Sequence, residues 1–189
     1  TDYVFDGAKG ALYTEEDTPR PINVYGQSKL EGEKGITQAG GDYLIFRTSW
    51  VYSLRKGGFV NKVLEWSRQK KTLRVVDDQI ANPTWARMLA EITAHIIGPD
   101  MGSIRDHPGL YHLAGSGFTS RYNWAKSILE LDSRRNEQVC EKLQPAKTSD
   151  FPTLAQRPLF SALDCQLFLN SFGTQLPDWE DALKLAMEQ

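Results

Sequence analysis

The chain begins with Thr1-Asp2-Tyr3-Val4-Phe5-Asp6-Gly7, and a second block reads Pro21-Ile22-Asn23-Val24-Tyr25-Gly26-Gln27-Ser28-Lys29. The first block, rich in β-branched and aromatic residues, predicts the end of a strand over 1–5, and residues 6–20 predict a long polar loop. Residues 23–38 then predict a helix. An open α/β sheet places its chemistry beyond the carboxyl ends of its strands. We therefore expect a functional site where this helix begins.

Tyr25 and Lys29 stand four residues apart in that predicted helix, so their side chains share one face. A nearby ammonium favours the phenolate form of a tyrosine, and such a pair can donate a proton to a carbonyl oxygen. The same spacing also joins Tyr52 to Lys56 and Tyr122 to Lys126. The polar loop before Tyr25 favours the Tyr25–Lys29 pair as the site of chemistry. Tyr52 instead ends a strand-like run, and Tyr122 has the pattern of a core aromatic.

The rest of the chain alternates between predicted helices and strands, which indicates an α/β fold with a doubly wound sheet. Strands are predicted at 43–50, 73–76, 110–113 and 142–145. Helices are predicted at 59–69, 85–97, 119–131, 165–171 and 179–187, and Gly98-Pro99 is expected to end the second of these. Residues 148–161 contain two prolines, Pro152 and Pro158, and predict an ordered loop.

Composition excludes several classes of function. The net charge of −2 over 189 residues gives no basic field for nucleic acid. No apolar run approaches the ~18 residues of a membrane span, and no secretory signal is present, so a cytoplasmic location is expected. Cys140 and Cys165 form no paired motif, and His107 and His112 flank a loop, so we predict no metal site.

Four blocks in register resemble the dTDP-4-dehydrorhamnose reductases, a family of extended short-chain dehydrogenases/reductases. They are the two blocks quoted above, Phe46-Arg47-Thr48-Ser49-Trp50-Val51-Tyr52, and Asp78-Gln79-Ile80-Ala81-Asn82-Pro83-Thr84. The resemblance implies part of a doubly wound, Rossmann-like parallel sheet with a smaller, helix-rich substrate lobe. Roughly residues 1–100 would complete the dinucleotide-binding sheet and roughly 101–189 would form most of the lobe, the two being interleaved.

The resemblance also implies a reaction, the NAD(P)H-dependent reduction of dTDP-4-dehydro-6-deoxy-L-mannose to dTDP-L-rhamnose. Tyr25 would donate the proton, Lys29 would assist it and hold the cofactor ribose, and Thr1 would stabilise the developing alkoxide. Tyr25 and Lys29 would thus also bind NADPH or NADH. Trp50 would be a platform for the deoxysugar.

Asp2, Asn82 and Arg157 complete the expected substrate contacts. The amide of Asn82 suits a diphosphate or a base, although it equally suits a turn-stabilising role. Arg157 suits a diphosphate, and pairing with a carboxylate is an equal alternative. A homodimer is left open, and the sequence does not support a Mg²⁺ ion at a subunit interface.

Members of this family begin with a glycine-rich turn that holds the cofactor pyrophosphate. The sequence contains no such turn, and we expect it to be the C-terminal portion of a longer enzyme, lacking about a hundred residues and inactive alone. Two alternatives remain. One is a related sugar-nucleotide epimerase or dehydratase, and the other is a non-catalytic regulatory subunit like that of methionine adenosyltransferase. Trp50 favours the reductase over both.

Overall fold

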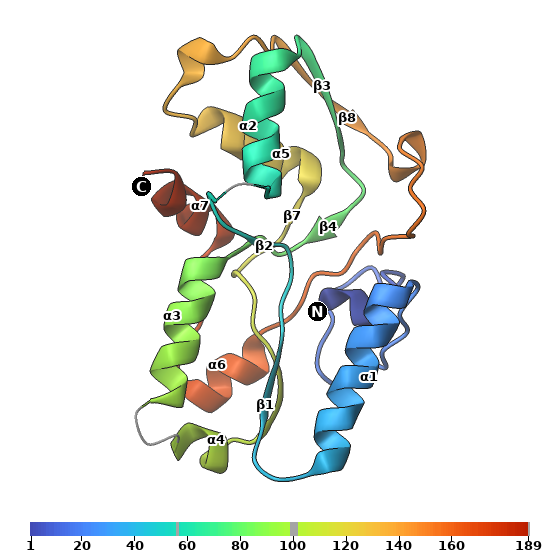
Figure 1. Cartoon of the computed structure of the whole chain (residues 1–189), viewed down its shortest axis with the longest axis vertical. Helices are drawn as coiled ribbons and strands as arrows, with labels where there is room; N and C mark the ends of the chain where they lie inside the picture. Colours follow the sequence, from blue (N-terminus) through green and yellow to red (C-terminus); the bar gives the residue numbers. More distant parts are fainter. Residues whose placement is uncertain (56, 99–101, 189) are drawn as a thin grey trace.

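The computed structural model of the chain describes residues 1–55, 57–98 and 102–188, in which helices and short strands alternate (Figure 1). The α-helices are α1 (Val24–Ala39), α2 (Phe59–Gln69), α3 (Ala86–Ile97), α4 (Gly102–Asp106), α5 (Arg121–Glu130), α6 (Gln166–Phe172) and α7 (Trp179–Met187). The strands are β1 (Leu44–Arg47), β2 (Val51–Tyr52), β3 (Thr72–Val76), β4 (Ile80–Ala81), β5 (Thr84–Trp85), β6 (Gly109–His112), β7 (Thr119–Ser120) and β8 (Lys142–Ala146). The 3-10 helices are η1 (Asp2–Val4), η2 (Arg135–Glu137) and η3 (Thr148–Asp150).

The six helices expected from the sequence are confirmed, with ends that differ by at most two residues, and α2 has the predicted bounds. Helix α1 starts as expected because the side chain of Asn23 accepts a hydrogen bond from the backbone N–H of Gly26 at 2.8 Å. Pro99, which was expected to follow α3, lies outside the described residues.

The predicted strand at residues 1–5 is wrong, because residues 2–4 form the 3-10 helix η1. The backbone N–H of Asp2 donates to the carbonyl of Thr48 at 3.1 Å, so the segment starts beside the end of β1. The N–H of Phe5 then donates to the carbonyl of Asp2 at 3.1 Å, which turns the chain instead of extending it. This turn brings the first residues of the chain to the carboxyl end of β1.

Strands β1 and β6 form a parallel pair with helices on both faces, as a doubly wound sheet requires. Figure 1 shows α1 on one side of β1 and helices α3 and α6 on the other. On the second side, Ile96 of α3 and Phe168 of α6 are buried against Tyr111 and Leu113. The expected α/β architecture is therefore confirmed.

A second group of elements lies beyond the carboxyl end of β1, at the top of Figure 1. Strands β3 and β8 pair in parallel, and α2, α5 and α7 pack around the fully buried side chain of Trp124. The group thus combines residues 59–76 with residues 121–146 and 179–187. The parallel pair of β2 and β5 and the antiparallel pair of β4 and β7 lie between this group and β1.

None of the helices in the described part of the chain is both long and apolar enough to cross a membrane.

Candidate functional site

The start of α1, the helix η1 and the end of β1 meet around an open cavity of about 560 Å³, which we call the tyrosine cavity. Thr1 and Asp2 come from the chain start, Tyr25 and Lys29 from α1, and Trp50 from the segment after β1. The cavity also includes Arg121, from the first turn of α5. The structure therefore brings together five of the seven site residues predicted from the sequence.

Tyr25 and Lys29 lie on one exposed face of α1. The Tyr25 side chain is 51% exposed, and the Nζ atom of Lys29 lies 5.7 Å from the centroid of its ring. The ring of Tyr25 meets that of Tyr3 edge to face, with centroids 5.7 Å apart. Within the described residues, neither the Tyr25 hydroxyl nor the Lys29 ammonium has a hydrogen-bond or ion-pair partner, so both are available to a ligand.

Thr1 and Asp2 lie at the inner wall of the tyrosine cavity. The Thr1 hydroxyl donates to one carboxylate oxygen of Asp2 at 3.3 Å, and the hydroxyl of Ser161 donates to the other at 2.7 Å. Asp2 is 3% exposed, and burial raises its pKa, while the hydrogen bonds from Ser161 and Thr1 act in the opposite direction. Asp2 is thus already held by hydroxyl groups of the chain, and one of these is the Thr1 hydroxyl.

Trp50 occupies a backbone conformation that side-chain-bearing residues rarely adopt. Its φ of 38° is the sole positive value for a residue other than glycine in the described chain. Its indole stacks on that of Trp124, with centroids 5.5 Å apart and planes 13° apart. Such strain is found mainly at functional sites, where the surroundings hold it in place.

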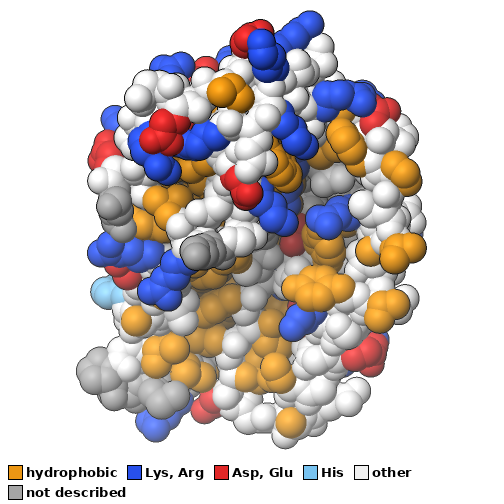
Figure 2. All heavy atoms as spheres, turned by 45° about the horizontal axis from the view of Figure 1, so that its top comes forward, with side chains coloured by type: hydrophobic (Ala, Val, Ile, Leu, Met, Phe, Trp, Pro, Cys, Tyr) orange, Lys and Arg blue, Asp and Glu red, His pale blue; other side chains and the backbone are white. Residues whose placement is uncertain are grey.

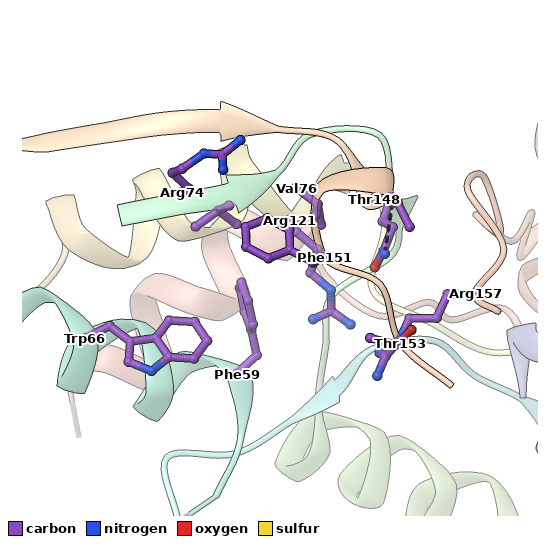
Figure 3. Close-up of a pocket in the computed structure, with 11 residues that line it drawn as sticks. Phe59, Trp66, Arg74, Val76, Arg121, Thr148, Phe151, Thr153 and Arg157 are labelled. Atoms are coloured by element: carbon purple, nitrogen blue, oxygen red, sulfur yellow. Dashed lines mark hydrogen bonds between the residues drawn. The ribbon is translucent and has the colours of Figure 1, made fainter. Parts of the chain in front are cut away.

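A second cavity of about 260 Å³ adjoins the first, and we call it the aromatic cavity (Figure 3). The rings of Phe59, Trp66 and Phe151 line it, together with Arg157 and, again, Arg121. The turned view in Figure 2 shows hydrophobic and basic side chains around a hollow in this face of the molecule.

Arg157 lines the aromatic cavity and not the tyrosine cavity, but it is connected to both. Its Nη1 atom donates to the hydroxyl of Tyr3 at 3.4 Å, and Tyr3 contacts Tyr25. The residue is exposed, and no carboxylate within the described chain pairs with it. The alternative of a structural ion pair for Arg157 therefore finds no support.

Asn82 is 2% exposed and lies away from both cavities. Its Nδ2 atom donates to the carbonyls of Gly117 at 2.8 Å and Leu163 at 3.3 Å, and its Oδ1 atom accepts from the N–H of Leu163 at 2.8 Å. Because its amide is bonded to backbone groups of two distant segments, the structure supports a structural role that joins these segments, and neither a role within its own turn nor the expected substrate contact.

The sequence analysis missed Arg121, which the structure places at both cavities. Its guanidinium carbon lies 3.7 Å from the centroid of the Trp50 ring and 4.7 Å from that of Phe59. Burial lowers the pKa of Arg121 to about 10. The one available signal was its position directly after the N-cap Ser120, where a cation faces the positive end of the helix dipole.

The two other tyrosines with a lysine four residues on are less suited to chemistry. Tyr52 is 3% exposed inside the core, and burial raises its pKa, while Lys56 lies outside the described residues. Tyr122 is half-buried and packs against the core around Trp124, and Lys126 lies 4.0 Å from Glu130. Tyr25 is thus the most exposed of the three tyrosines, and its role in catalysis stays a prediction.

Among residues 1–55, 57–98 and 102–188, no three or more His, Cys, Asp or Glu side chains are grouped so as to hold a metal ion.

Comparison with known sequences gives consistent relatives. Residues 1–189 match the family model described as the RmlD substrate binding domain. A dTDP-4-dehydrorhamnose reductase of Escherichia coli K12 is 37% identical over 190 residues, covering 100% of this chain and 63% of the relative. One from Burkholderia thailandensis is 36% identical over 195 residues, covering 99% of this chain and 65% of the relative. The chain thus spans slightly less than two thirds of these relatives.

Solved structures agree. A dTDP-4-dehydrorhamnose reductase from Clostridium acetobutylicum superimposes with a TM-score of 0.87 at 30% identity, covering 99% of this chain and 62% of that one. One from Bacillus anthracis, in complex with NADP, gives 0.85 at 31% identity, covering 99% of this chain and 63% of that one. A dTDP-glucose 4,6-dehydratase, at 12% identity and a TM-score of 0.73, shares the fold. The match along its whole length shows that this chain belongs to the RmlD substrate binding domain family.

Proposed function

We propose that the protein containing this chain reduces dTDP-4-dehydro-6-deoxy-L-mannose to dTDP-L-rhamnose with NADPH or NADH. The observation that carries the proposal is the tyrosine cavity, in which Thr1, Tyr25, Lys29 and Trp50 line one space. The reductases to which the chain is similar at 36–37% identity supply the reaction.

In this proposal the Tyr25 hydroxyl donates the proton that the carbonyl oxygen of the sugar takes up. Its free hydroxyl and half-exposed ring on the cavity wall suit that role. The Lys29 ammonium, 5.7 Å from the ring centroid, adds a positive charge that stabilises a phenolate. Thr1 would add a second hydroxyl at the same oxygen. Its single proton, which is donated to Asp2 at 3.3 Å, would turn to the sugar oxygen when the substrate binds.

A bound reduced nicotinamide would supply the hydride, which is the chemistry of the cofactor. The residues present fit its ribose, because the unpaired Lys29 ammonium and the Tyr25 hydroxyl both face the cavity. The NADP in the Bacillus anthracis reductase supports a cofactor of this class. Because both the cofactor and a dTDP-sugar are metabolites of the cytoplasm, we place the reaction there.

The rest of the nucleotide sugar would extend from the tyrosine cavity into the aromatic cavity. Trp50 would face the deoxysugar, Arg157 would pair with the diphosphate, and the rings of Phe59, Trp66 and Phe151 would contact the base. The two cavities share Arg121 as a common wall, so a single extended ligand can occupy both.

The test is to mix the purified complete protein with dTDP-4-dehydro-6-deoxy-L-mannose and NADPH or NADH. We expect oxidation of the cofactor and formation of dTDP-L-rhamnose, identified by mass spectrometry. Conversion of the sugar without net cofactor consumption would favour an epimerase or dehydratase. Binding of the cofactor without any turnover would favour a regulatory subunit.

A further inference from the structure

Arg121 is a cation without an anionic partner in the described chain. Within the described residues the Arg121 guanidinium forms no hydrogen bond and no ion pair. It contacts the rings of Trp50, Phe59 and Trp124. The other substantially buried arginines are neutralised, since Arg47 pairs with Glu33 and Arg68 pairs with Asp132. Arg121 therefore differs from them in lacking a counter-charge.

The position of Arg121 is unfavourable for the folded protein by itself. It is the first residue of α5, where the positive end of the helix dipole repels a cation. Burial further disfavours its charged form and lowers its pKa to about 10. The nearby Arg157 acts in the same direction, whereas Tyr3 and Asp2 act in the opposite one without reversing the shift. The ring faces of Trp50 and Phe59 offset part of this cost. A bound anion would offset the rest.

The guanidinium lies where an anion of an extended ligand would pass. Arg121 lines both the tyrosine cavity and the aromatic cavity. In Figure 3 the side chains of Arg121 and Arg157 reach into the same space beside Phe59 and Phe151. Two cations that converge on a space bordered by aromatic rings suit a phosphate chain that is joined to a base.

The Arg121 guanidinium also stacks on the indole of Trp50. The guanidinium carbon is 3.7 Å from the Trp50 ring centroid, and the Trp50 backbone is strained at a φ of 38°. An anion that holds the Arg121 guanidinium in place therefore also restricts the Trp50 indole that stacks on it. Trp50 lines the same cavity as Tyr25, so this restriction acts at the proposed place of reduction.

We propose that Arg121 is a positioning residue, which binds the diphosphate of a nucleotide sugar between the two cavities and thereby holds the Trp50 indole in place for the sugar. The inference rests on the proposed function for the identity of the ligand. It adds a residue that neither the sequence analysis nor the relatives assigned, and it joins binding of the nucleotide to the orientation of the sugar platform.

The test compares dTDP with thymidine as probes for the complete protein, using calorimetry and tryptophan fluorescence. We expect the wild type to bind dTDP more tightly than thymidine, with an affinity for dTDP that falls as salt rises. The Arg121→Gln variant should lose about 10- to 100-fold in dTDP affinity and little in thymidine affinity. Arg121→Lys should recover part of the affinity but not the fluorescence change, because an ammonium does not stack as a guanidinium does.

Controls separate this role from a structural one. The change in fluorescence on dTDP binding should be absent in Trp50→Phe, which assigns the signal to Trp50. The matched control is Arg87→Gln, because the Arg87 guanidinium lies 5.8 Å from the Trp85 ring centroid but is exposed and paired with Glu91. This variant should bind dTDP as the wild type does. Arg121→Met should melt at the same temperature as the ligand-free wild type or higher, because it removes an uncompensated charge.

The proposal is wrong if Arg121→Gln keeps both the dTDP affinity and the fluorescence change. It is also wrong if that variant loses dTDP and thymidine equally, which would indicate general damage, or if the wild type does not prefer dTDP over thymidine. A protein that binds dTDP through Arg121 but oxidises no NADPH would overturn the reductase proposal and leave this one intact.

Discussion

Glu33 of α1 and Arg47 of β1 form a buried, two-point ion pair. The Nη2 atom of Arg47 lies 2.7 Å from Oε2 of Glu33 and its Nε atom lies 3.1 Å from Oε1, with side chains that are 4% and 10% exposed. Helix α1 carries Tyr25 and Lys29, and Trp50 follows β1 by three residues. The pair therefore fixes the helix of the proposed proton donor to the strand that leads to the sugar platform.

Removing one partner of this pair should destabilise the fold strongly. Glu33→Ala leaves the Arg47 cation buried without a counter-charge, and we expect the free energy of unfolding to fall by about 3–5 kcal/mol. Urea denaturation followed by circular dichroism measures this change.

The double variant Glu33→Leu with Arg47→Met serves as the control for that measurement. It removes both charges and keeps an apolar contact, so most of the lost stability should return. If the double variant were as unstable as Glu33→Ala, the uncompensated charge would not be the cause of the loss.

Gly26 should be essential for the approach of α1 to η1. A Cβ atom at Gly26 would overlap the carbonyl oxygen of Tyr3 and lie 2.9 Å from Cβ of Pro21, whereas a Cβ atom at Gly32 would meet no atom within 4 Å. Gly26→Ala should therefore move Tyr25 relative to Thr1 and cost about 1–3 kcal/mol of stability together with most of the turnover. Gly32→Ala should stabilise by up to about 1 kcal/mol at unchanged turnover. Equal effects of the two variants, measured by thermal melting and initial rates, would contradict this account.

His112 should make the fold sensitive to acid. Burial, followed by the charge of Arg47, lowers its pKa from 6.5 to about 3, and its Nδ1 atom lies 3.0 Å from the carbonyl oxygen of Tyr13. Below pH 6.5 the His112 side chain binds a proton in the unfolded chain, whereas in the folded chain it stays neutral down to about pH 3. The free energy of unfolding therefore falls as the pH drops from about 6.5 to about 3. The slope should approach about 1.4 kcal/mol per pH unit. His112→Gln should flatten this part of the profile of unfolding free energy against pH, and an unchanged slope would argue against His112 as its source.

Local signals in the sequence were enough for most of the secondary structure. Asn23 and Ser120 accept hydrogen bonds at the starts of their helices as N-caps do, and the apolar set of α2 gave its bounds. The face shared by Tyr25 and Lys29 follows from helical spacing alone. The backbone of η1 approaches Gly26 closely, whereas the space around Gly32 is open, and the glycine letters alone do not distinguish these two surroundings.

Features that depend on distant contacts were not predictable. Residues 2–4 form η1 because the carbonyl of Thr48 accepts a bond from Asp2, and a β-rich sequence gives no sign of that partner. Asn82 is occupied by Gly117 and Leu163, which lie 35 and 81 residues away along the chain. The role of Arg121 likewise depends on its stack with Trp50, which only the folded chain creates.

The most direct test of the account compares turnover of Tyr25→Phe with that of Tyr122→Phe in the complete protein. Both tyrosines precede a lysine by four residues, but only Tyr25 lines the tyrosine cavity. We expect Tyr25→Phe to reduce kcat by about 10²- to 10⁴-fold while dTDP affinity stays within a few fold, because a proton donor is lost and the binding groups remain. Tyr122→Phe should keep near-normal kcat. A Tyr25→Phe variant that turns over at the rate of the wild type would contradict the central claim that Tyr25 delivers the proton.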